Sequence, residues 1–130
     1  MTKNNISKLR RQLQAIPQQL ESLLPALRGH GALLKAYLSF SPRTCGKPGC
    51  RCARGELHPA WILRHPEGRR TRSRSLAQRT YQRLCGSAEE YRRFRQARVR
   101  WNHLMKQADE WLRQVETLRS MDLQQALEDE

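Results

Sequence analysis

The sequence predicts a mostly helical α+β fold, with two long helices flanking a cysteine-rich loop and a β-hairpin. The helices are indicated by apolar residues that recur at alternating steps of three and four in residues 6–27 and 94–118. The hairpin is indicated by an apolar run, a turn signal and an alternating segment within 59–76. We therefore expect three segments: an N-terminal helical, coiled-coil segment over 1–30, a zinc knuckle with a basic β-hairpin over 31–76, and C-terminal helices with an acidic tail over 77–130.

The N-terminal helix has one apolar stripe and two internal prolines, Pro17 and Pro25. A proline inside a helix removes a hydrogen bond, so we expect a kink at Pro17 or two helices in succession. Gly29 and Gly31 predict where the helix stops. Residues 33–40 fit either a last helical turn or a strand, and we favour a strand. The stripe consists of Ile6, Leu9, Leu13, Ile16, Leu20, Leu23 and Leu27.

In the hairpin, residues 66–68 (Pro-Glu-Gly) are predicted to form the turn, since proline suits the first turn position and glycine a positive φ. Alternate residues of a strand share a face. The return strand should therefore present Arg70, Arg72 and Arg74 as one row of guanidinium groups.

The C-terminal part predicts a short helix near 77–85 and then a long one. Ser87 and Glu90 have the spacing of an N-terminal capping box, so the long helix should begin there and run to about Ser120. Each long helix has one apolar stripe, which must pair either with the other stripe or with a second copy of the chain. The second stripe consists of Phe94, Ala97, Trp101, Leu104, Ala108, Trp111, Val115 and Leu118.

Positive charge is concentrated in the middle of the chain. The net charge of +13 divides into +5 for residues 1–42, +12 for 43–100 and −4 for 101–130. Arginine supplies 20 of the 25 basic residues, and its planar fork matches phosphate geometry. This pattern predicts a nucleic-acid partner. The charge pattern alone does not separate DNA from RNA, and we favour DNA because a two-stranded ribbon fits the major groove. The candidate contacts are Arg64, Arg69, Arg70, Arg72, Arg74, Arg79, Arg92, Arg93 and Arg95.

Two aromatic residues near these arginines are further candidates for contact with nucleic acid. Trp61 and Tyr81 could stack a nucleic-acid base, although a place in the core is the simpler expectation for both.

Three of the four cysteines lie within eight positions, in the spacing C-x4-C-x-C-x5-H. Structural zinc takes four Cys or His ligands, and three Cys with one His is a common set. The spacing predicts zinc bound by Cys45, Cys50, Cys52 and His58. His65 or Cys85 could replace His58 as the fourth ligand. Free cysteines or a disulfide are the alternative to a metal.

No enzymatic activity is predicted. Four protein ligands leave no open position on a zinc ion for water or substrate. The sequence has no phosphate-binding glycine loop and no G-x-S-x-G motif. A redox role for the cysteines would need an exposed, low-pKa thiolate, which nothing in the sequence requires.

No membrane segment is expected. The chain has no run approaching the ~18 apolar residues of a membrane span, and its first residues have no apolar core for export. We therefore expect a cytoplasmic protein. In a reducing compartment, clustered cysteines bind metal more often than they form disulfides.

The run CGKPGCRCARGELHPAW, followed by EGRRTRSRS and YRRFRQ, resembles an uncharacterised family of short bacterial proteins. The family pattern is C-G-K-x-x-C-x-C-A-x-G with a nearby His, a T-R-S-R strand and a Y-R-R-x-R helix. The resemblance covers about residues 43–98. It implies a small accessory protein, often encoded near transposases or in mobile elements, with metal ligands at the positions of Cys45, Cys50, Cys52 and His58.

Two functions are consistent with these observations. The first is a non-enzymatic nucleic-acid-binding accessory protein, in which a zinc knuckle supports an arginine-rich hairpin. The alternative is a coiled-coil protein-interaction adaptor whose helical stripes recruit a larger enzyme, such as a transposase.

Overall fold

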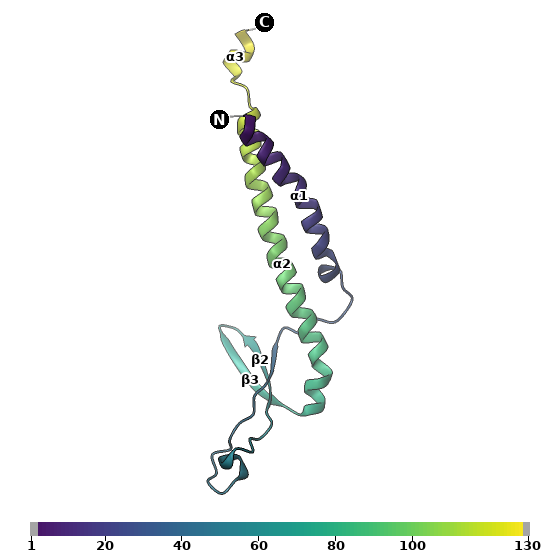
Figure 1. The fold of residues 1–130 in the computed structure, drawn as a ribbon, viewed down its shortest axis with the longest axis vertical. Helices are drawn as coiled ribbons and strands as arrows, with labels where there is room; N and C mark the ends of the chain where they lie inside the picture. The colour runs from purple at the N-terminus through teal and green to yellow at the C-terminus, as the bar shows by residue number, and fades with distance from the viewer. Residues whose placement is uncertain (1–2, 129–130) are drawn as a thin grey trace. The chain divides into compact units, whose positions relative to one another are not determined.

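The computed structural model describes residues 3–128 and confirms a mostly helical α+β fold (Figure 1). Two compact units divide these residues: α1 with the part of α2 from Gln96 onward and α3, and the continuous segment Gly29–Arg95. None of the helices in the described range is both long and apolar enough to cross a membrane. The elements are α1 (Lys3–Leu27), β1 (Tyr37–Phe40), the 3-10 helix η1 (Arg51–Arg54), β2 (Trp61–Glu67), β3 (Arg70–Leu76), α2 (Gln78–Arg119) and α3 (Leu123–Glu128).

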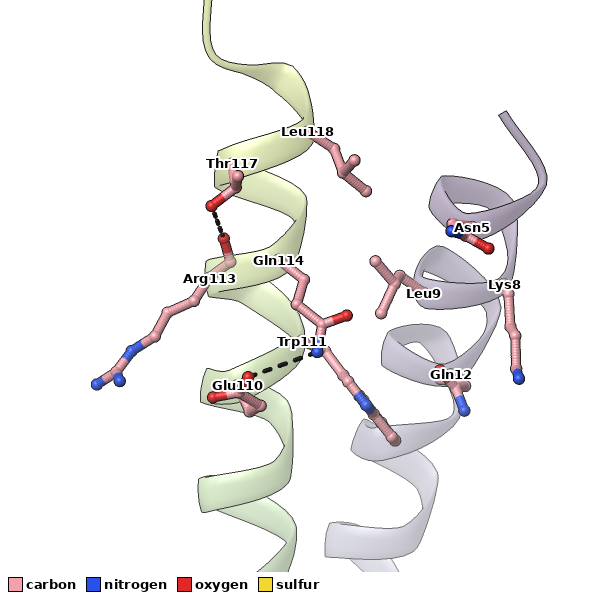
Figure 2. Close-up of a pocket in the computed structure, with 10 residues that line it drawn as sticks. All are labelled: Asn5, Lys8, Leu9, Gln12, Glu110, Trp111, Arg113, Gln114, Thr117 and Leu118. Carbon is pink, nitrogen blue, oxygen red and sulfur yellow. Dashed lines mark hydrogen bonds between the residues drawn. The ribbon is translucent and has the colours of Figure 1, made fainter. Parts of the chain in front are cut away.

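The two apolar stripes pair within one chain. Leu9 and Ile16 of α1 and Ala97 and Leu104 of α2 are buried, and the other members of both stripes are at least partly covered. The first turns of α1 lie beside the last turns of α2, so the two helices are antiparallel (Figures 1 and 2). The leucine and tryptophan stripes of α1 and α2 thus pack on each other within one chain, without a second copy.

α1 is a single helix that contains both of its prolines, so the expectation of two helices in succession is wrong. Pro17 and Pro25 are both exposed, Pro25 on the side away from the stripe and Pro17 at its border. Each still lacks the N–H that would bond to the preceding turn, and the kink at Pro17 stays a prediction. The helix ends at Leu27, just before the glycines that predicted its stop.

The three strands form one antiparallel sheet in the order β1-β2-β3. β1 confirms the strand favoured for this part of residues 33–40, and β2 with β3 confirms the hairpin. β2 is central, with Leu63 opposite Leu38 on one side and opposite Arg74 on the other. Ile62 of β2 is the buried residue of the sheet.

The hairpin turn lies further along the chain than predicted. Glu67 pairs with Arg70, so the loop consists of Gly68 and Arg69, with φ of 64° at Gly68. A positive φ at the first loop position suits the two-residue turns that match strand twist. Pro66 instead belongs to β2, beyond the part that β1 covers, where its missing N–H has no strand to bond.

The predicted break between two C-terminal helices is also wrong, because α2 runs unbroken through Ser87 and Glu90. A capping box is a local signal, and here tertiary contacts of the helix override it. One such contact is the hydrogen bond of 3.0 Å that the Leu34 N–H donates to the Ser87 carbonyl.

Leu104 should be the residue on which the helix pair depends most. Its side chain is 1% exposed, so Leu104→Ala should lower the free energy of unfolding by about 2–5 kcal/mol, because it removes buried apolar surface and leaves a cavity. Leu112→Ala is the matched control, since Leu112 lies on the same helix and is 53% exposed. Urea unfolding followed by circular dichroism measures both. Equal losses of stability in the two variants would contradict the pairing.

Candidate metal centre and nucleic-acid interface

The cysteine loop, residues 43–58, closes on an extension of the sheet. Beyond β1, the Ser41 N–H donates to the Ala60 carbonyl at 2.8 Å. Arg43 and His58 then exchange two backbone hydrogen bonds of 2.9 and 2.8 Å. The ladder thereby fixes where His58 stands and brings both ends of the loop together.

Inside the loop, tight turns direct three cysteine side chains inward. The Cys50 N–H donates to the Lys47 carbonyl at 3.1 Å, and η1 begins directly afterwards with Cys52 in it. Gly46 and Gly55 have φ of 81° and 109°, a region that disfavours any residue with a Cβ. The turns therefore depend on glycine at both positions.

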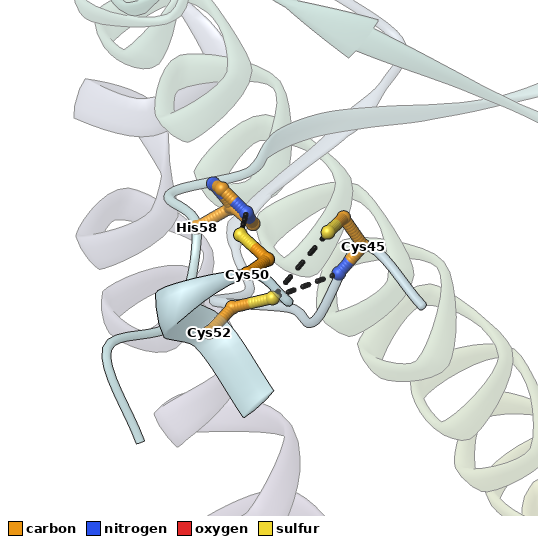
Figure 3. A group of neighbouring side chains, drawn as sticks. All are labelled: Cys45, Cys50, Cys52 and His58. Atoms are coloured by element: carbon orange, nitrogen blue, oxygen red, sulfur yellow. Dashed lines mark hydrogen bonds between the residues drawn. The ribbon is translucent and has the colours of Figure 1, made fainter. Parts of the chain in front are cut away.

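The four predicted ligands meet at one point (Figure 3). Their donor atoms all lie within 4.8 Å of one another. Cys45 Sγ is 3.5 Å from Cys52 Sγ, and Cys50 Sγ is 3.1 Å from His58 Nε2. Tetrahedral zinc with three sulfurs and one nitrogen places its donors roughly 3.5–3.8 Å apart. The arrangement thus fits a four-coordinate metal ion.

Little besides this cluster can hold the loop together. Cys52 is 2% exposed and is the buried side chain of the loop, while Leu57, its largest apolar residue, is 47% exposed. Surface loops longer than ~12–15 residues without secondary structure are uncommon unless they have a function. A metal bound by four side chains would replace the missing apolar core, as it does in small metal-dependent domains.

The electrostatics of the cluster favour a bound cation. Hydrogen bonds from the backbone and side chain of Cys52, and then from His58 and Cys45, lower the pKa of the Cys50 thiol to about 6. The Cys45 N–H lowers the pKa of Cys52, but burial and the sulfurs of Cys45 and Cys50 outweigh it and raise that pKa. Interaction with Cys50 and then Cys45 raises the pKa of His58. The cluster thus favours the thiolate of Cys50 and opposes that of Cys52, and a positive charge among the sulfurs would stabilise both thiolates.

The two alternative ligands lie elsewhere. His65 is in β2, with its ring near the Pro66 carbonyl, and Cys85 is in α2. Neither belongs to the group of four. All four cysteines are free thiols, so the disulfide alternative is not found.

The predicted arginine row lies on one face of β3. Arg70, Arg72 and Arg74 are all exposed, and their alternation puts them on the same side of the sheet. Arg64 pairs with Ser73, so it lies on the opposite face from the row. Arg69 lies in the turn, and Arg79 and Arg93 are exposed on α2.

Three of the nine candidate arginines form ion pairs, all exposed. Arg72 contacts Glu67 at 2.8 Å, Arg92 contacts Glu89 at 2.9 Å, and Arg93 lies 3.5 Å from Glu90. Exposed pairs of this kind contribute little to stability, so a phosphate can compete for these arginines. The other six form no ion pair within residues 3–128.

A second basic surface could not be read from the sequence. A cavity of about 590 Å³ lies between α2 and the sheet within Gly29–Arg95. Arg64, Arg92 and Arg95 line it, although they are separated in sequence. Residues missed by sequence reasoning join them, namely Lys35, Tyr37 and Tyr91.

Tyr81 and Trp61 have distinct surroundings. Trp61 is packed between Phe40 and Tyr81, with ring centroids 5.2 and 6.4 Å away. Tyr81 also lines the cavity, and burial, followed by the nearby Cys85 and Tyr37, raises its pKa. Trp61 and Tyr81 are thus both partly covered, with Trp61 packed between two other rings and Tyr81 facing the cavity.

Comparison with known proteins gives a family and no activity. Residues 6–84 match the family model described as a domain of unknown function, DUF6788. The match includes most of α1, the cysteine loop, the whole sheet and the start of α2. No curated protein and no solved structure matches the chain. Because the matched range is more than half of the sequence, the chain belongs to the DUF6788 family.

Proposed function

We propose that this protein binds nucleic acid without acting as an enzyme, and that DNA is its partner. The observation that carries the proposal is the exposed row of Arg70, Arg72 and Arg74 on one face of an edge strand. A two-stranded ribbon can enter the major groove, where arginine bonds to phosphates or to guanine. The mobile-element setting implied by the sequence resemblance would suit such an accessory protein.

In this proposal the metal is zinc, and its role is structural. Three thiolates and one imidazole match the ligand preference of zinc, and a filled tetrahedron leaves no position for a substrate. The zinc with three thiolates would carry a net charge of −1, which the exposed Arg43, Lys47, Arg51 and Arg54 around it would offset. The loop joins β2 just before Trp61, so the metal would stiffen the base of the hairpin whose far end holds the arginine row.

The adaptor alternative has less support. Its recruiting surfaces were to be the two apolar stripes, and these are largely covered by each other within one chain. A protein partner would then need residues outside the stripes.

Removing a ligand should remove the metal. Cys52→Ser should reduce zinc from about one ion per chain to nearly none, because three ligands hold the ion far more weakly than four. Native mass spectrometry of the purified chain gives the metal count. The loop should also become sensitive to trypsin at Arg51 and Arg54 in Cys52→Ser, or after treatment of the natural chain with a chelator.

Cys85→Ser is the matched control, since Cys85 is a thiol of α2 outside the cluster. It should keep its zinc and its resistance to trypsin. Undiminished zinc in Cys52→Ser, or an equal reduction in both variants, would refute the site.

The arginine row should account for part of the salt dependence of DNA binding. Replacing Arg70, Arg72 and Arg74 together by Gln should weaken binding. It should also reduce the slope of log affinity against log salt by about 0.9 for each phosphate that the variant no longer binds. Fluorescence anisotropy with a short duplex over a salt series measures both quantities.

A variant with Arg10, Arg11 and Arg28 changed to Gln provides the control. These arginines are exposed in or next to α1, and replacing them changes the net charge by the same amount. The proposal fails if the two triple variants are weakened equally, or if the natural chain binds neither DNA nor RNA at low salt.

A further inference from the structure

The cavity between α2 and the sheet is built from both elements. From the sheet come Tyr37, Arg64 and Pro66, which the strand register places on one face. Along α2, the lining residues recur at steps of three and four and so share one face of the helix. They are Tyr81, Cys85, Ala88, Glu89, Arg92 and Arg95, with Tyr91 adjacent. The cavity volume of about 590 Å³ lies within the ~300–1,000 Å³ typical of small-ligand sites.

Two tyrosines that line the cavity have ring faces that are not stacked on another aromatic ring. Tyr37 is 61% exposed, and Tyr91 is partly covered. Neither ring pairs with another aromatic ring among residues 3–128, unlike Phe40, which packs on Trp61. An exposed tyrosine at a cavity mouth offers one face for stacking and a hydroxyl for hydrogen bonding.

The charge of the cavity selects an anion. Four basic side chains line it (Lys35, Arg64, Arg92 and Arg95) together with the acidic Glu89, which gives a net charge of +3. Glu89 is already engaged by Arg92, at 2.9 Å. Arg64, Arg95 and Lys35 have no ion-pair partner in the described part of the chain. They are therefore free to bind a phosphate, for which the arginine fork is well suited.

We propose that this cavity binds a nucleoside phosphate, with the base stacked on Tyr37 or Tyr91 and the phosphate held by Arg64 and Arg95. This inference takes its ligand class from the proposed function and so rests on that function. It deepens the proposed function by assigning an unpaired nucleotide to a site on the opposite face of the sheet from the arginine row. The ligand can be one nucleotide of a single strand or a free nucleotide. Planar base and phosphate are common to both.

The experiment titrates the full-length, metal-loaded chain with adenosine monophosphate, adenosine, inorganic phosphate and a single-stranded oligodeoxyadenylate. Calorimetry gives the affinities for the small ligands and anisotropy those for the oligonucleotide. Tyr37→Leu and Arg95→Gln should each weaken the binding of adenosine monophosphate about tenfold, since a stacked base or a charged contact is worth roughly one decade in affinity. Adenosine and phosphate alone should bind more weakly than the monophosphate.

Two control variants match these changes. Phe40→Leu removes another exposed aromatic ring of β1 that does not line the cavity, and Arg74→Gln removes an arginine of the opposite face. Both should bind adenosine monophosphate like the natural chain. Circular dichroism melting curves for all four variants exclude unfolding as the cause, and Arg95 is exposed and on the helix surface.

The outcomes separate this inference from the proposed function. Equal adenosine monophosphate affinity in the cavity and control variants overturns the inference. If the monophosphate does not bind and the oligonucleotide is sensitive to Arg74→Gln but not to Tyr37→Leu, the inference fails and nucleic-acid binding stands. If the monophosphate binds through Tyr37 and Arg95 while no oligonucleotide binds, the cavity is a free-nucleotide site and the proposed function fails.

Discussion

The pairing of β2 with both of its neighbours is the interaction on which the Gly29–Arg95 unit depends. Its register with β1 continues through the Arg43 and His58 bridge, and so positions one metal ligand. Its register with β3 decides which arginines share a face. A shift of one residue would move every side chain of a strand to the other face. The buried Ile62 opposes such a shift, because it would become exposed.

The cysteine loop illustrates how a chain with few apolar residues can still form defined structure. Its backbone bonds determine the two ends and the turn at Lys47, but between these points only Cys52 is buried. Side chains that coordinate one ion supply crosslinks in place of packing. Because the loop has no apolar core, the aliphatic parts of the surrounding arginine side chains have nothing to pack against, and these arginines stay exposed.

Much of this structure could be predicted from local patterns. The steps of three and four predicted the buried face of α1 and α2, and the close spacing of Cys45, Cys50, Cys52 and His58 predicted their cluster. Errors arose where a local signal competed with tertiary contacts, as at Ser87, whose capping pattern lies inside a continuous helix. The turn was misplaced because proline at residue 66 is also tolerated in a strand that lacks a neighbour on one side.

Other features depend on information that spacing does not contain. The separation of Arg64 from the row of Arg70, Arg72 and Arg74 follows from the pairing register, which the sequence did not define. Tyr37 and Arg95 meet at one cavity only because α2 lies beside the start of β1. The helical spacing of Tyr81, Arg92 and Arg95 could have indicated a shared face, but not the strand residues opposite it.

The division of α2 between two units has a consequence for how the chain matures during synthesis. Gly29–Arg95 is continuous, so it can fold as soon as it has left the ribosome. α1 is made before α2, yet the stripe that covers it begins only at Phe94, so the leucines of α1 stay exposed while the intervening segment is translated. A neighbouring nascent chain presenting the same residues would compete for α1 in that interval. The spacing of the apolar residues lets α1 pair with α2 of the same chain. During synthesis this pairing wins only when α2 is translated faster than two nascent chains meet.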